Sequence, residues 1–86
     1  MNDSRELAQK IIDKYITILG VLPVYLLLQD IPNIKLNSKG KVLGIRDDKN
    51  TLLKLINALE PYTGKFIKRN VMAKYMTDYE SGKEIT

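Results

Sequence analysis

Residues 34–45, IKLNSKGKVLGI, decide the fold class, because their apolar residues change from helical to strand spacing. Residues 37–40, NSKG, are typical of a type I turn followed by a glycine in the left-handed region. The segments on either side of this turn therefore form a β-hairpin. Because an isolated two-stranded hairpin is only marginally stable in water, this hairpin must lie on helices.

The pairing of the two strands follows from the turn. Leu36 pairs with Val42, and Ile34 pairs with Gly44. Because side chains alternate between the two faces of a strand, the three large apolar residues of these pairs share one face. We expect that face to cover the protein core. The opposite face carries two more apolar residues that need a cover of their own, Leu43 and Ile45.

Two helices are expected before the hairpin. Asp3 or Ser4 can cap the first helix, and apolar residues recur at helical spacing through residues 7–19. Gly20 can adopt a positive φ and end this helix. The second helix is expected at residues 23–29, because a proline at its start is well tolerated there.

Two further helices are expected after the hairpin. Pro61 should end or kink the third helix, and the fourth should run from about residue 63 to 78 or 79. The chain is therefore predicted to be a small, mostly helical α+β domain with the order α-α-β-β-α-α. Residues 1–80 form this single domain and residues 81–86 a frayed tail. The third helix can be capped by one of three polar residues, Asp47, Asp48 or Asn50.

The sequences on the two sides of the hairpin contain a weak internal repeat. Two apolar residues, 11 and 12, precede Gly20 at the same distances at which residues 55 and 56 precede Gly64. Residues 27–28 and 71–72 follow the two glycines at equal distances. Two helix–glycine–helix units would explain this pattern. Chance is the safer interpretation, because Leu and Ile are abundant throughout the chain.

The composition excludes several classes of functional site. The 86 residues include no Cys and no His. Disulfides, zinc–thiolate centres and Ser-His-Asp or Cys-His nucleophile systems therefore cannot form. Catalysis by Lys, Asp, Glu or Tyr has no constellation of residues to support it. The sequence thus predicts a protein that is not an enzyme and that holds no metal or cofactor.

The longest uncharged stretch, residues 15–29, carries the main functional hypothesis. It is shorter than the ~20 residues that span a bilayer, so we expect no membrane span and a cytoplasmic location. A helix that is apolar on every side is buried in its own core or in a partner. An ordinary core helix and attachment to a membrane surface remain the alternatives. We predict an interaction or regulatory module that forms a homodimer, or binds another protein, through Val24, Tyr25, Leu27, Leu28, Leu43 and Ile45.

The basic residues support an alternative function, nucleic-acid binding. The net charge is +4, and two segments without acidic residues carry the whole excess. Segment 35–46 contributes Lys35, Lys39, Lys41 and Arg46, and segment 65–74 contributes Lys65, Lys68, Arg69 and Lys74. Aromatic residues alternate with the second set, and such rings can stack on bases while the cations contact phosphates. Rings packed in the core beneath solvating lysines explain the same pattern.

Overall fold

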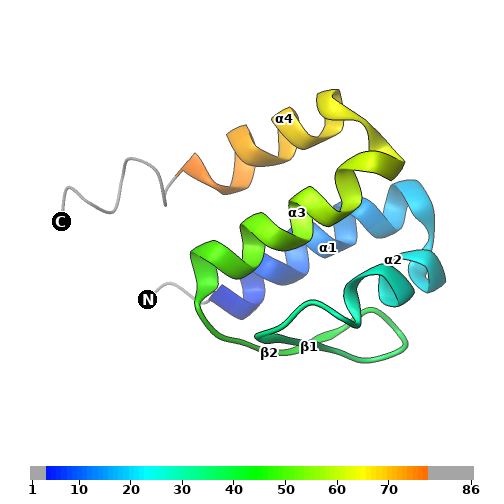
Figure 1. Ribbon diagram of the computed structural model, residues 1–86, viewed down its shortest axis with the longest axis vertical. Helices are drawn as coiled ribbons and strands as arrows, with labels where there is room; N and C mark the ends of the chain where they lie inside the picture. Colours follow the sequence, from blue (N-terminus) through cyan, green and yellow to red (C-terminus); the bar gives the residue numbers. More distant parts are fainter. Residues whose placement is uncertain (1–3, 78–86) are drawn as a thin grey trace, which may run out of the picture.

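The computed structural model describes residues 4–77 and confirms the predicted order of elements. Figure 1 shows α1 and α3 lying side by side, with α2 and the hairpin on one side of this pair and α4 on the other. The Asp3 cap, a fourth helix reaching 78 or 79, and the frayed tail 81–86 concern residues outside the described part. The elements are α1 Ser4–Leu19, α2 Val21–Leu28, β1 Ile34–Leu36, β2 Val42–Ile45, α3 Asp48–Thr63 and α4 Lys65–Tyr75.

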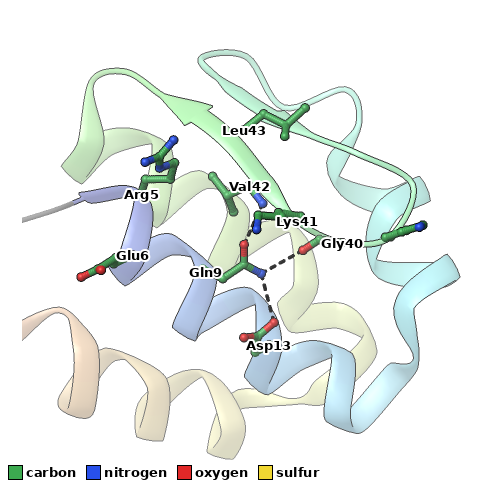
Figure 2. Close-up of a pocket in the computed structure, with 9 residues that line it drawn as sticks. Arg5, Glu6, Gln9, Asp13, Gly40, Lys41, Val42 and Leu43 are labelled. Carbon is green, nitrogen blue, oxygen red and sulfur yellow. Dashed lines mark hydrogen bonds between the residues drawn. The ribbon is translucent and has the colours of Figure 1, made fainter.

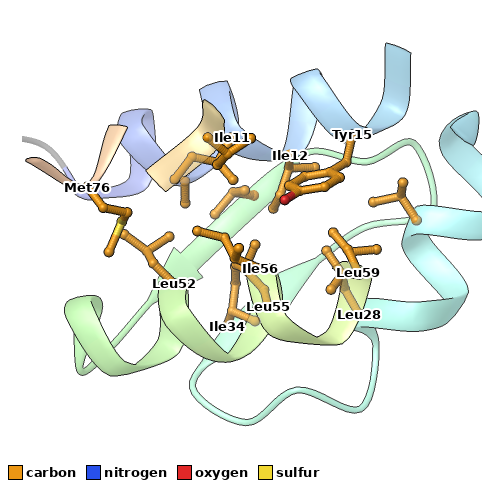
Figure 3. Close-up of a cluster of buried hydrophobic side chains, with 14 residues drawn as sticks. Ile11, Ile12, Tyr15, Leu28, Ile34, Leu52, Leu55, Ile56, Leu59 and Met76 are labelled. Atoms are coloured by element: carbon orange, nitrogen blue, oxygen red, sulfur yellow. The ribbon is translucent and has the colours of Figure 1, made fainter. Parts of the chain in front are cut away.

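The two long helices run parallel and in register. Ser4 at the start of α1 donates a hydrogen bond through Oγ to the carboxylate of Asp48 at the start of α3. These residues are 44 positions apart, and the buried residues of the two helices follow the same offset. Their side chains meet in the core shown in Figure 3. The equivalent buried positions are Ala8, Ile11, Ile12 and Tyr15 in α1 and Leu52, Leu55, Ile56 and Leu59 in α3.

Both long helices end at a glycine that reverses the chain into a short helix. Gly20 has φ 95° and ψ 158°, and Gly64 has φ 95° and ψ 165°. Each glycine N–H donates to the carbonyl four residues earlier at 2.7 Å. The structure therefore contains a helix–glycine–helix unit on each side of the hairpin, although chance was the safer explanation of the repeat in the sequence. The two units share one turn geometry. Their positive φ is the reason a glycine stands at each corner.

Pro61 was predicted to end or kink α3, and it does not end the helix. The helix continues to Thr63, and the N–H of Gly64 donates to the carbonyl of Glu60 at 2.7 Å. A proline removes one helical donor, which here would have reached the carbonyl of Asn57. Asn57 and Pro61 are both exposed, so water can satisfy that carbonyl. Because Pro61 lies near the end of α3, it destabilises the helix less than a proline in the middle of the helix would.

The hairpin has the predicted turn but a different strand register. Leu36 pairs with Val42 as predicted, whereas Ile34 pairs with Ile45 and not with Gly44. The cause is a β-bulge that adds one residue to β2, which shifts every later residue to the opposite face. Ile45 therefore packs against the core with Ile34, and its predicted place on the outer face was wrong. Leu43 remains exposed.

The side chain of Gln9 holds the hairpin on α1, as Figure 2 shows. Its Nε2 donates to the carbonyl of Gly40 at 2.9 Å, and its Oε1 accepts from the N–H of Val42 at 2.8 Å. A second Nε2 bond, to Asp13 Oδ1 at 3.0 Å, fixes the orientation of the amide. The amide thus forms hydrogen bonds with two backbone groups of the hairpin.

Gly40 also lies in close contact with the helices. It has φ +84°, and its N–H donates to the carbonyl of Asn37 at 2.9 Å. A Cβ at this position would lie 2.6 Å from Cδ1 of Ile16 and 3.0 Å from Cγ2 of Val21. The absence of a side chain therefore serves both the turn and the packing of the turn against α1.

We expect Gly40→Ala to lower the melting temperature substantially. The positive φ alone costs about 1 kcal/mol, which corresponds to roughly 4–8 °C in a domain of this size, and the contact with Ile16 adds to it. Gly40→Asn should be as damaging, because it introduces the same Cβ. Thermal unfolding followed by circular dichroism measures the effect.

Gly44→Ala is the matched control, because a Cβ there meets nothing within 4 Å and its φ is not positive. Ile16→Val removes the atom nearest to the added Cβ and should partly restore the stability of Gly40→Ala. Equal melting temperatures for Gly40→Ala and Gly44→Ala would contradict this account of the turn.

Candidate interaction surface

The structure divides α2 into a buried face and an exposed face. Val24 and Leu28 are fully buried in the core of the same chain, so their prediction as interface residues was wrong. Both side chains pack toward the α1–α3 pair, so this helix pair, and not a partner protein, buries them. Tyr25 and Leu27 are half-buried. Only the outer face of α2 remains accessible to a partner.

Large apolar side chains are exposed where α1 turns into α2. We call this set the first corner; its members are Ile18, Val21, Leu22 and Leu26, and they are 38 to 58% exposed. None of them was among the predicted interface residues. Leu22 and Leu26 are four residues apart on α2 and therefore share one face of that helix, whereas Ile18 belongs to α1, before the turn at Gly20. That spacing was the signal that could have identified Leu22 and Leu26.

A second apolar pair is exposed where α3 turns into α4. Tyr62 and Phe66, here called the second corner, are 58 and 72% exposed. They lie 44 positions after Ile18 and Leu22, the same offset that relates the helices. The interpretation that the aromatic rings pack into the core is wrong for Tyr62 and Phe66, whereas Tyr75 packs against the core. Figure 1 shows both glycine turns at the same end of the molecule.

The hairpin contributes little apolar surface to this end. Leu43 is 52% exposed, but it lines a separate groove of about 520 Å³ between the hairpin and α1. Figure 2 shows this groove beside Gln9, whose amide is already engaged with the hairpin backbone and Asp13. Glu6 and Asp13 of α1 line the groove together with Lys39 and Lys41.

The two basic segments do not form one surface. The hairpin and α4 lie on opposite sides of the α1–α3 pair (Figure 1). All eight predicted nucleic-acid residues are exposed except Lys68, which is partly buried. On the hairpin side, the acids of α1 reduce the positive potential around Lys39 and Lys41. On the α4 side, Lys65 and Arg69 are exposed beside the rings of the second corner.

Two cations of α4 make local contacts. Lys68 Nζ lies 3.1 Å from Glu60 Oε1 in an ion pair between α4 and α3. Lys74 Nζ lies 5.5 Å from the centre of the Tyr75 ring, within the range of a cation–π interaction. Lys68 is thereby partly neutralised. Lys65 and Arg69 are left as the cations that flank the second corner.

Tyr15 carries a buried hydroxyl group without a hydrogen-bond partner. The side chain is fully buried between α1 and α3, near Leu59 (Figure 3). Burial, and secondarily the charge of Glu60, raise the pKa of Tyr15 from 10.0 to about 12. An unsatisfied buried hydroxyl destabilises the folded state. Packing of the ring therefore explains why Tyr15 is buried, and the unsatisfied hydroxyl lowers the free energy of unfolding.

Other searches for a site give no further candidate. Within residues 4–77, no helix is both long and apolar enough to cross a membrane. Among the same residues, no three carboxylates gather closely enough to hold a metal ion. Comparison with protein families, curated proteins and solved structures finds no match to this chain. The cytoplasmic location remains a prediction.

We expect Tyr15→Phe to stabilise the protein. The substitution keeps the buried ring and removes the unsatisfied oxygen, which should raise the free energy of unfolding by about 1 kcal/mol. The melting temperature should rise by roughly 4–8 °C. Tyr25→Phe is the control, because Tyr25 is only half-buried and should respond little.

The same variant should change the response to alkaline pH. In the unfolded chain Tyr15 ionises near its ordinary pKa of 10.0, whereas the folded state holds the proton to about pH 12. The folded state is therefore disfavoured progressively as the pH rises from 10 to 12. Denaturant titrations should show the stability of Tyr15→Phe falling less over that range. A parallel fall for both proteins would contradict the assignment.

Proposed function

We propose that this protein is a non-enzymatic interaction module that associates with a second copy of itself through the first corner. The observation that carries the proposal is the cluster of four exposed large apolar side chains in an uncharged stretch of the chain. Contiguous apolar surface of this kind marks interaction sites on small proteins. Burying it also stabilises a domain whose own core is small.

The distribution of charge favours a second copy at this surface. The chain is positive overall, so contacts between copies through the basic segments would be repulsive. Residues 15–29 carry no charge and can meet in a second copy without that penalty. The proposal retains self-association from the sequence analysis. It replaces Val24 and Leu28 with the exposed residues of the first corner.

We expect the wild-type protein to dimerise at micromolar concentration, and Leu22→Lys or Leu26→Lys to give monomers. Both side chains are exposed, so the fold should survive while a desolvated ammonium opposes association. Sedimentation equilibrium gives the mass in solution, and circular dichroism checks the fold. Asn57→Lys, which adds the same charge at an exposed site on α3, is the control and should remain dimeric.

A wild-type chain that stays monomeric at several hundred micromolar would refute the proposal. Leu43→Lys separates the contribution of the hairpin. Because Leu43 lines the groove beside α1, away from the first corner, this variant should also remain dimeric.

A second candidate function is the binding of single-stranded nucleic acid. The observation that favours it is the exposure of Tyr62 and Phe66 beside Lys65 and Arg69. Exposed rings can stack on bases while neighbouring cations contact phosphates, and no sequence readout is required. The α4 side suits this function better than the hairpin because its cations adjoin exposed rings. Glu60 also lies among these cations, where it pairs with Lys68, whereas two acids of α1 lie among the hairpin lysines.

For this candidate, we expect the α4 side to dominate any binding of a single-stranded oligothymidylate. Lys65→Glu with Arg69→Glu should weaken binding at least about tenfold, and the affinity should fall steeply with salt. The matched double reversal Lys39→Glu with Lys41→Glu should change binding much less. Fluorescence anisotropy at several salt concentrations measures both. Equal losses from the two pairs would contradict the assignment to α4.

A further inference from the structure

The two corners are equivalent parts of one approximately symmetric end of the molecule. α1 and α3 are parallel and in register, and their buried residues and glycine turns follow a common offset of 44 positions. An approximate twofold axis therefore runs along the α1–α3 pair. It relates Ile18 and Leu22 of the first corner to Tyr62 and Phe66 of the second.

The hydrogen bonds around the two turns follow the same relation. Gly20 N–H donates to Ile16, and Gly64 N–H donates to Glu60, both at 2.7 Å. The carbonyls of the two glycines accept from residues 24 and 68 at 3.4 and 3.2 Å. The backbone of the two corners is thus the same, and the side chains differ. The first corner is aliphatic and uncharged, whereas the second is aromatic and flanked by Lys65 and Arg69.

A second copy placed against this end could bring like corners or unlike corners together. Either arrangement gives a closed twofold dimer in which the same surface of each copy is used. The charges distinguish the two arrangements. Like-corner contact would bring Lys65 and Arg69 of both copies together, with no acid between residues 61 and 77 to compensate them. Glu60 is already engaged by Lys68.

We infer that the second copy docks with unlike corners in contact, so that Leu22 of each copy meets Phe66 of the other. This inference rests on the proposed self-association and specifies its geometry. The cations of each second corner then face the uncharged residues 15–29 of the other copy. The interface then contains two equivalent contacts, in each of which the aromatic second corner of one copy is buried against the aliphatic first corner of the other. Both corners, and not the first alone, make up the interface.

Complementary charges at the two positions test the pairing. Leu22→Glu and Phe66→Lys should each weaken self-association at least about tenfold, since each places an unpaired charge in the interface. An equimolar mixture of the two variants should form a heterodimer close to wild-type affinity. In that heterodimer one contact pairs the introduced carboxylate with the introduced ammonium, and the other keeps the native Leu22 and Phe66.

A mixture of Leu22→Lys with Phe66→Lys is the matched control. It introduces like charges at the same two positions and should stay monomeric. Sedimentation velocity of labelled mixtures measures the heterodimer, and circular dichroism of each variant checks that these exposed substitutions leave the fold intact. Recovery in the first mixture alone supports the unlike pairing.

Two results would overturn the inference while leaving self-association in place. One is a Phe66→Lys variant that dimerises like the wild type, which would remove the second corner from the interface. The other is an equal amount of heterodimer in the two mixtures, which indicates contact between like corners. A monomeric wild-type protein would instead refute the proposed function itself.

Discussion

The parallel packing of α1 against α3 determines the position of every other element. Eight buried residues at equivalent positions meet along this contact, and each large one contributes about 1.5–3 kcal/mol by leaving water. The short helices and the hairpin attach to its two sides (Figure 1). The Gln9 amide and the close approach at Gly40 fix the hairpin in particular.

The same arrangement explains why apolar side chains remain exposed at one end. Two parallel helices of equal length end side by side, and each glycine turn sends the chain back along the outside of the pair. The short helices therefore cover the flanks and leave the turns themselves bare. Among residues 4–77, no element covers Leu22 or Phe66, which are 58 and 72% exposed. The proposed surface for association thus arises from the geometry that builds the core.

Self-association and nucleic-acid binding would compete for the second corner. An exposed ring such as Phe66 can be buried against an aliphatic partner surface or stacked on a base. Lys65 and Arg69 favour an anionic ligand, whereas the aliphatic first corner at the same end favours a second copy. The position of both turns at the same end of the molecule is the reason for favouring the second copy (Figure 1). Both proposals leave out the hairpin lysines, because Glu6 and Asp13 lie among them.

Local patterns in the sequence determined the order of elements, the turn at residues 37–40 and the glycines that end the long helices. These depend on backbone preferences of a few adjacent residues, which the sequence states directly. Only the tertiary structure decided three further features. The bulge turned Ile45 to the core, the α1–α3 pair covered Val24 and Leu28 while leaving Leu22 bare, and acids of α1 came to lie beside basic residues of the hairpin. Each depends on contacts between segments far apart in the chain, which local spacing does not contain.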